Sequence, residues 1–256
     1  MELLHSNVLG SGKPLVILHG FLGMSDNWKT LGRRFAETGM EVHLVDQRNH
    51  GRSFWSPSFS YEILAADLER YLDRKGIGRC LLLGHSMGGK TAMTFATAFA
   101  SRVEKLLVAD IGPRRYAPHH QAILGALSGL PLETVQSRGE ADAWLARELP
   151  DPGIRQFLLK NLYWETPRKL GFRFNLDVLK KQGETIGAAL PAQAQYPGPT
   201  LFLRGGKSDY VRDSDRDTLR AHFPQAEVKT LAGAGHWLHA EQPDAFFEIA
   251  VEFYDS

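Results

Sequence analysis

Short apolar runs alternate with amphipathic stretches in the N-terminal half of the chain and again near its C-terminus. Strands of a parallel sheet are covered on both faces and therefore read as nearly continuous apolar runs. We expect such strands at residues 14–18, 41–46, 79–83, 103–110, 200–204 and 227–231. Residues 61–75 place Leu64, Leu68 and Leu72 on one side of a helix that Gly76 can end. The pattern predicts an α/β protein with a mostly parallel, doubly wound sheet.

This alternation stops in the middle of the chain. From about residue 114 to residue 199 we find no convincing strand, and prolines interrupt several short helical patterns. We therefore expect a helical cap at 114–199, here called the cap segment, inserted into a core formed by 1–113 and 200–256. Open α/β sheets bind ligands at the C-terminal ends of their strands, so the cap segment should cover the site.

Large apolar residues of the cap segment either line an acyl pocket or pack the cap helices together. Those considered are Trp144, Phe157, Leu158, Leu162, Tyr163, Trp164, Phe172 and Phe174. Packing within the cap is the better interpretation for any one of them.

Composition places the chain among ordinary globular proteins. It has 256 residues, 43% of them hydrophobic, and a formal net charge of +1, which does not favour a nucleic-acid partner. No apolar run approaches the ~20 residues of a membrane helix. The first residues lack the features of a signal peptide. Cys80 is a single cysteine and has no partner for an internal disulfide. We expect a cytoplasmic protein that is a monomer or a weak homodimer and does not span a membrane.

The sequence Gly-His-Ser-Met-Gly at residues 84–88 lies between an apolar run and a helix of small residues. This is the G-x-S-x-G pattern of a nucleophile elbow, in which a tight turn presents Ser86 at the start of a helix. The free N–H of Met87 can then stabilise an oxyanion. A second donor is expected at Phe21, where Gly20 leaves room for the backbone after the first strand.

Residues 84–91 also match the phosphate-binding pattern G-x-x-x-x-G-K-T. An NTPase is therefore a formal alternative. A phosphate-binding loop usually follows the first strand, whereas two predicted strands precede the strand that leads into this loop. We interpret Lys90 as a solvated lysine on the helix after Ser86, and we favour the nucleophile elbow.

A serine nucleophile needs a neighbouring base, and His236 is the best candidate. It follows two glycines in Gly-Ala-Gly-His-Trp at residues 233–237, after the last predicted strand. His19 and His85 flank motif residues and are expected to shape the site. His236 and His239 have no cysteine or carboxylate cluster at ligand spacing, so we predict no metal and no cofactor.

The carboxylate that would orient His236 has two candidates, Asp110 and Asp209. Asp110 ends an apolar run, where an unpaired carboxylate would be costly to bury. Asp209 lies in a polar turn after the next strand and could cap that loop instead. We favour Asp110 and keep Asp209 as the alternative acid.

On these motifs the chain resembles the small, capped carboxylesterases and acyl-CoA thioesterases of the α/β-hydrolase superfamily, found in bacterial cytoplasm and in mitochondria. The resemblance implies the α/β-hydrolase fold, with Asp110 as the acid. It places Ser208 at the more common acid position of the superfamily, near the histidine. Asp209, beside Ser208, departs from some members and keeps the acid open. The matching pieces lie at residues 18–23, 46–53, 84–89, 108–113, 172–175, 204–211 and 234–243.

Together these features predict a serine hydrolase that forms an acyl-enzyme with a small-molecule substrate. Carboxylic esters and acyl thioesters are the substrates that the resemblance implies. The alternative is a lyase or C–C bond hydrolase on the same scaffold, acting on a multiply charged substrate. Arginines of the cap segment could bind its anionic groups, although a solvated surface is the better interpretation of them; they are Arg114, Arg115, Arg168 and Arg173.

Overall fold

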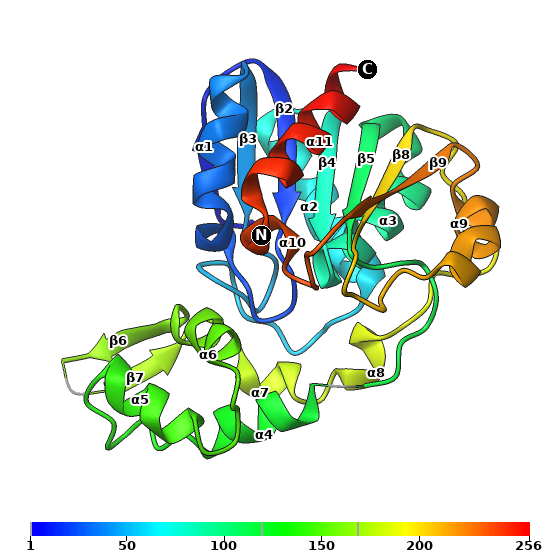
Figure 1. Cartoon of the computed structure of the whole chain (residues 1–256). Helices are drawn as coiled ribbons and strands as arrows, with labels where there is room; N and C mark the ends of the chain where they lie inside the picture. Colours follow the sequence, from blue (N-terminus) through cyan, green and yellow to red (C-terminus); the bar gives the residue numbers. More distant parts are fainter. Residues whose placement is uncertain (1, 119, 168) are drawn as a thin grey trace.

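The computed structural model describes residues 2–118, 120–167 and 169–256 of the chain. In this part of the chain the apolar runs form a seven-stranded sheet (Figure 1). Its strand order is β1-β3-β2-β4-β5-β8-β9, and every neighbouring pair is parallel except β1 with β3. The strands are β1 (Ser6–Leu9), β2 (Lys13–Leu18), β3 (Met40–Val45), β4 (Cys80–His85), β5 (Val103–Ala109), β8 (Thr200–Gly205) and β9 (Ala226–Leu231). The prediction of a mostly parallel sheet is confirmed.

The edge strand β1 was absent from the expected set. It has only four residues, and its side chains are half-buried or exposed rather than fully covered. It therefore lacks the continuous apolar run by which the other strands can be recognised.

Helices cover both faces of the sheet, because successive residues of a strand point to opposite sides. Leu82 of β4 packs in one apolar cluster with residues of α2 and α3, while Leu81 and Leu83 pack with α1 and α11. In Figure 1, α1 and α11 lie in front of the sheet and α2 and α3 behind it. These elements and their neighbours are α1 (Lys29–Glu37), α2 (Tyr61–Lys75), α3 (Met87–Ala98), α9 (Arg216–His222), α10 (Leu238–Glu241), α11 (Pro243–Asp255) and the short 3₁₀ helices η1 (Ser25–Trp28), η2 (Ala100–Arg102) and η3 (Asp213–Asp215).

Helix α2 has the bounds that the sequence predicted. The Ser60 hydroxyl accepts a hydrogen bond from the N–H of Ile63 at the start of the helix. Gly76, with φ of 70°, takes the left-handed conformation that ends it.

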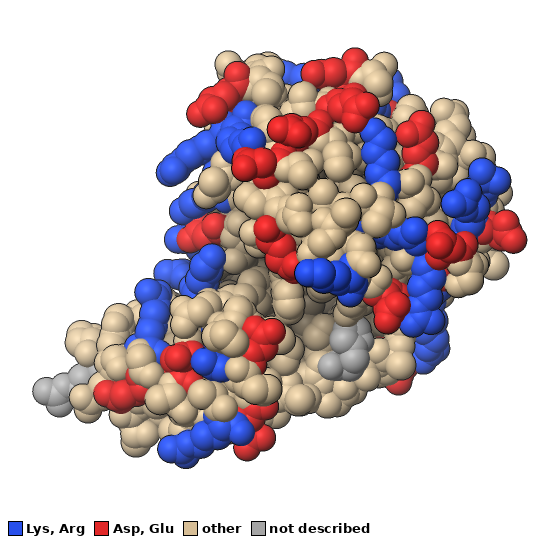
Figure 2. Space-filling model, in the orientation of Figure 1, with Lys and Arg blue, Asp and Glu red and all other residues tan. Residues whose placement is uncertain are grey.

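The cap segment lies beyond the C-terminal ends of the strands, and most of it forms a lobe at the lower left of Figure 1. Its apolar cluster is continuous with Phe21, Leu22 and Met87 of the sheet part, so the two parts share a core at the site. Basic and acidic side chains are interspersed over both parts on the face shown in Figure 2. The cap elements are α4 (Gln121–Gly129), α5 (Arg138–Leu145), α6 (Pro152–Leu159), β6 (Leu162–Thr166), β7 (Lys169–Phe172), α7 (Leu176–Leu179) and α8 (Gly183–Ile186).

The expectation that the cap segment contains no strand was wrong. Strands β6 and β7 pair as an antiparallel hairpin with an irregularity between Trp164 and Thr166. Leu162, Leu170 and Phe172 are buried in the cap cluster, whereas Trp164 on β6 is exposed. Strands this short contain too few alternating positions to be separated from helical patterns by periodicity alone.

Candidate active site

The turn between β4 and α3 places Ser86 in a strained conformation at the start of a helix. Its φ of 53° and ψ of −118° lie outside the regions that a residue with a side chain readily adopts. The turn requires small neighbours. A Cβ on Gly84 would lie 2.2 Å from the carbonyl oxygen of Gly88, and one on Gly88 would lie 2.3 Å from that of Leu18. The two flanking glycines therefore allow the strand, the turn and the helix to pack this closely.

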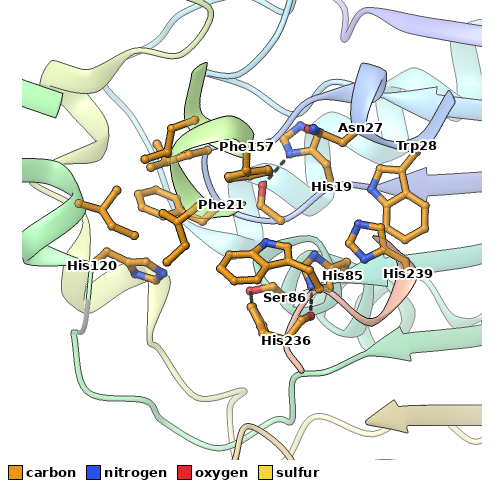
Figure 3. A pocket seen from close by; sticks show the side chains of 17 residues that line it. His19, Phe21, Asn27, Trp28, His85, Ser86, His120, Phe157, His236 and His239 are labelled. Carbon is orange, nitrogen blue, oxygen red and sulfur yellow. Dashed lines mark hydrogen bonds between the residues drawn. The ribbon is translucent and has the colours of Figure 1, made fainter. Parts of the chain in front are cut away.

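Ser86, His236 and Asp110 are joined by hydrogen bonds. The Nε2 atom of His236 lies 3.1 Å from Oγ of Ser86, and its Nδ1 atom lies 2.7 Å from Oδ2 of Asp110. His236 lies in the loop between β9 and α10, and Figure 3 shows its ring beside Ser86. The geometry allows the imidazole to accept the serine proton while the carboxylate stabilises the resulting imidazolium.

Asp110 is fully buried and its carboxylate has several partners. Oδ1 accepts a hydrogen bond of 2.9 Å from the N–H of Gly205, and Oδ2 accepts one of 2.5 Å from the hydroxyl of Ser208. Gly205 ends β8, the neighbour of β5, and Ser208 lies in the turn that follows, so both donors reach the carboxylate from the adjacent strand. These bonds satisfy a buried charge that would otherwise be costly.

Asp209 occupies a different environment from Asp110. Its side chain is exposed, and its backbone carbonyl accepts hydrogen bonds from Arg114 and Arg212, each at 3.2 Å. Of the two candidate acids, the structure therefore brings Asp110 to His236 and leaves Asp209 at the surface.

The backbone N–H groups of Phe21 and Met87 are available for an oxyanion. Within the described residues, neither group donates a hydrogen bond to the protein. Met87 is the first residue of α3, where the helix dipole favours negative charge. The Phe21 loop passes close to the nucleophile, because a Cβ on Gly20 would lie 3.3 Å from Cβ of Ser86 and 2.8 Å from Nδ1 of His85.

His19 connects this loop to the helix that follows Ser86. Its Nδ1 donates to the carbonyl oxygen of Gly20 at 2.8 Å, and its Nε2 accepts from the N–H of Gln47 at 3.0 Å. The side chain of Gln47 in turn accepts a hydrogen bond from Thr91 of α3. Burial lowers the pKa of His19, in keeping with a neutral ring that both donates and accepts.

His50 and Asn161, which the sequence did not single out, bind the backbone of Leu22, the residue after Phe21. Leu22 has a φ of 57°; its N–H donates to Nε2 of His50 at 3.3 Å, and its carbonyl accepts from Nδ2 of Asn161 at 2.9 Å. Burial, followed by the neighbouring His19, lowers the pKa of His50 to about 3, so its ring is neutral and can accept. His50 lies within a motif quoted above, at 46–53, but nothing in the local sequence marks Asn161, which lies in the cap segment.

His85 supports the loop that carries His236. Its Nε2 donates to the backbone carbonyl of His236 at 2.8 Å, and burial holds its pKa well below the ordinary value. His239 lies next to it, stacked on Trp28 with a ring distance of 4.1 Å. The Nδ1 atom of His239 is buried without a partner in the described structure, and burial lowers the pKa of this ring to about 3.

Two cavities meet at Ser86. The first, shown in Figure 3, lies under the cap segment against Phe21, Phe157, Leu158 and Trp237. The second is bounded by Met87, Lys90, Tyr116, Ile186, Gly187 and Tyr210. Of the cap residues considered for an acyl pocket, Phe157 and Leu158 line the first cavity. Leu162, Phe172 and Phe174 are buried in the cap cluster instead.

The expectation that Lys90 is solvated was wrong. Its side chain is fully buried, and Nζ donates to the carbonyl oxygens of Arg114 at 2.6 Å and Ala188 at 2.8 Å. Burial, followed by the charge of Arg114, lowers the pKa of Lys90 to about 7. An ammonium already bound to two carbonyls is not placed to bind a nucleotide phosphate, because the cap segment covers it.

Among the described residues, no group of three or more histidine, cysteine, aspartate or glutamate side chains could hold a metal ion. Nor is any helix in this part of the chain both long enough and apolar enough to cross a membrane.

Comparisons with known proteins extend over nearly the whole chain. Residues 15–249 match the model of the alpha/beta hydrolase family. The chain is 41% identical to the sn-1-specific diacylglycerol lipase ABHD11 of Mus musculus, over 93% of this chain and 80% of that protein. It is 38% identical to esterase YbfF of Escherichia coli, over 92% and 90%. A solved structure described as a marine microorganism esterase superposes with a TM-score of 0.95 at 37% identity, covering 99% of this chain and 100% of that one.

Proposed function

The chain belongs to the alpha/beta hydrolase family, and from that membership we propose that it is a serine hydrolase that cleaves carboxylic esters through an acyl-enzyme on Ser86. The observation that carries the proposal is the continuous hydrogen-bonded series from Oγ of Ser86 through His236 to the buried Asp110. A serine hydroxyl becomes an effective nucleophile when such a base accepts its proton.

The first half of the reaction acylates Ser86. Its Oγ attacks the acyl carbon while its proton passes to Nε2 of His236, and the Asp110 carboxylate stabilises the imidazolium. The N–H groups of Phe21 and Met87 bind the oxyanion of the tetrahedral intermediate. When this intermediate collapses, the bond from the acyl carbon to the leaving oxygen or sulfur breaks, and His236 returns the proton to the departing alcohol or thiol.

The second half releases the acid. Water replaces the leaving group beside His236, which accepts one of its protons as the water oxygen attacks the acyl-enzyme. Collapse of the second intermediate breaks the bond from the acyl carbon to Oγ, and the proton returns to Ser86. Every proton moves between Ser86, His236, water and the leaving group, so the sequence of steps consumes only the substrate and water.

We propose a small-molecule ester or acyl thioester with apolar parts as the substrate. The first cavity combines apolar side chains, such as Phe157 and Leu158, with the polar groups around Ser86. A pocket of this kind suits an apolar arm held by a few polar contacts at the reacting carbonyl. The names of the relatives, an esterase and a diacylglycerol lipase, support an ester as the substrate.

The lyase and C–C hydrolase alternative receives less support because the cap arginines have other partners. Arg114 pairs with Asp215 at 3.2 Å, and Arg115 pairs with Glu184. The guanidinium of Arg173 lies 4.5 Å from the ring of Tyr163. Arg168 lies outside the described residues. The NTPase alternative required a free Lys90, and the two carbonyls bound to its ammonium argue against it.

Labelling with a fluorophosphonate probe tests the proposed nucleophile. The wild-type chain and a variant with the exposed Ser101→Ala change should be labelled, should hydrolyse p-nitrophenyl acetate and should release an initial burst of product. Ser86→Ala should do none of these. Labelling of Ser86→Ala, or undiminished turnover by it, would contradict the proposal.

Two further predictions concern the protein as a whole. A monomer or weak homodimer should have a mass near 28.6 kDa or twice that value, as measured by size exclusion with light scattering.

The cytoplasmic location stays a prediction, which fractionation of the source cells would test.

A further inference from the structure

Lys90 binds two parts of the cap segment that lie far apart in the chain. It lies one helical turn after Ser86 in α3, and its Nζ donates to Arg114, where the cap segment begins, and to Ala188, where the chain returns towards β8. The two connecting segments also bind each other. The N–H of Tyr116 donates to Gly187 at 2.8 Å, and that of Leu190 donates to Pro113 at 2.9 Å. We call these two paired segments, residues 113–116 and 187–190, the neck. The ammonium therefore anchors the neck to the helix that presents the nucleophile.

Burying the ammonium of Lys90 costs free energy, which a side chain that only fills space would not require. No carboxylate within the described residues forms an ion pair with Lys90, and the nearby charge of Arg114 has the same sign. The ring of Tyr116, 5.0 Å from Nζ, supplies part of the compensation. An apolar side chain of similar length would fill the space without burying a charge. What the ammonium adds is the connection between α3 and the neck.

The same neck forms the wall of the second cavity. Tyr116 and Gly187, which pair across the neck, line this cavity together with Ser86 and Lys90. The segments are in close contact, because a Cβ on Gly187 would lie 2.1 Å from the carbonyl oxygen of Tyr116. A change in the distance between α3 and the neck would therefore change the width of the cavity beside the nucleophile.

We propose that Lys90 is a specificity-determining positioning residue, whose ammonium holds both connecting segments of the cap against α3 and so sets the width of the second cavity. The inference rests on the proposed function, because it assigns that cavity to one arm of the ester. Lys90 contacts neither the reacting atoms nor His236; it acts on the substrate through the neck.

The test compares selectivity in Lys90→Met, which keeps the length of the side chain and removes its donors. One series uses p-nitrophenyl esters from acetyl to dodecanoyl, and the other uses acetates of increasingly bulky alcohols. Only one arm occupies the second cavity, so selectivity should change by about ten-fold or more in one series and by less than about two-fold in the other. A change of this size is typical when a pocket gains or loses about one methylene of space. It should appear mainly in KM.

A matched control is available in Lys105. Its Nζ also donates to two backbone carbonyls, those of Phe253 at 3.0 Å and Tyr254 at 3.2 Å, and it also lies near an aromatic ring. It belongs to the first half of β5, away from both cavities, so Lys105→Met should preserve selectivity in both series. Lys90→Gln, which keeps two N–H donors on a shorter side chain, should give an intermediate result and provides a second variant.

Hydrogen exchange supplies a readout that does not depend on turnover. Backbone amides of residues 111–118 and 183–190 should exchange faster in Lys90→Met than in the wild-type chain and in Lys105→Met. Unchanged exchange and selectivity in folded Lys90→Met would overturn the inference, as would a uniform loss on every ester. Failure of the proposed function would differ, since the wild-type chain itself would then hydrolyse no ester and resist the fluorophosphonate probe.

Discussion

The Oδ2 atom of Asp110 lies 2.7 Å from Nδ1 of His236, although 126 residues separate them in the chain. Asp110 is fully buried and has a φ of 51°, so its backbone is strained at the point where β5 ends. Its carboxylate accepts hydrogen bonds from Gly205 at the end of β8 and from Ser208 in the turn after it. The acid is thus held by a neighbouring strand before it orients the histidine.

Replacing the acid tests its assignment. Asp110→Asn should lower kcat by about 10³-fold or more, because an amide neither fixes the required tautomer nor stabilises the imidazolium. Asp209→Asn should change kcat by less than about two-fold, since this carboxylate is exposed and away from His236. Steady-state kinetics on p-nitrophenyl acetate measure both. A large loss in Asp209→Asn alone would reverse the assignment.

Ser208 should contribute through the carboxylate that it binds. Ser208→Ala removes one of the donors to Oδ2 and leaves the hydrogen bond with His236 in place. A hydrogen bond to a charged group contributes roughly 1.5–3 kcal/mol, so we expect kcat to fall by about ten-fold or somewhat more, with little change in KM. A rise in KM at constant kcat would instead indicate that Ser208 contacts substrate.

The cap segment should influence the oxyanion site through Asn161. Asn161→Leu removes the hydrogen bond to the carbonyl of Leu22, which should let the Phe21 N–H move away from the oxyanion. Loss of a whole donor costs about 10²–10³-fold in kcat, so loosening one should cost about ten-fold, with KM nearly constant. Affinity for a boronic acid that mimics the tetrahedral intermediate should fall in parallel.

Asn175→Leu is the control for this change. Asn175 also lies in the cap segment and reaches the sheet part, where its Nδ2 donates to Oδ1 of Asn49 at 3.2 Å. It does not touch the Phe21 loop, so kcat should stay within about two-fold of the wild-type value. Equal losses in the two variants would show that only general contact between the cap segment and the sheet part matters.

His239 should make the protein sensitive to acid. Burial lowers the pKa of its ring from 6.5 to about 3, so between these values the unfolded chain binds a proton that the folded chain does not. This histidine therefore reduces the free energy of unfolding as the pH falls from 6.5 towards 3, by up to about 1.4 kcal/mol per pH unit. Its contribution to acid sensitivity is absent above that range.

His239→Phe removes the titration and keeps a ring to stack on Trp28. The variant should therefore gain stability over the wild-type chain as the pH is lowered from 7 to 5. Urea unfolding at both values measures the free energy of unfolding of each protein. A difference that stays constant or shrinks at the lower pH would contradict the buried, neutral state of His239.

The local parts of the fold and site could be predicted because their causes are local. The apolar run of β4, the glycines at 84 and 88 and the small residues of α3 are adjacent in sequence, and together they specify the turn at Ser86. The bounds of α2 followed from its amphipathic pattern and Gly76. The hairpin β6–β7 and the edge strand β1 were missed, since each is too short for its periodicity to be recognised.

By itself, the sequence determined the α/β class and a serine on a tight turn, and it marked the glycine loop that carries the histidine. Tertiary structure decided which aspartate meets that histidine, because β5 and β8 are neighbours whose C-terminal ends lie at one edge of the sheet. It also decided the environment of Lys90, which the sequence had led us to expect in solvent. The physical reason is the same in both cases: burial and hydrogen-bond partners depend on segments far apart in the chain, whose approach no local pattern records.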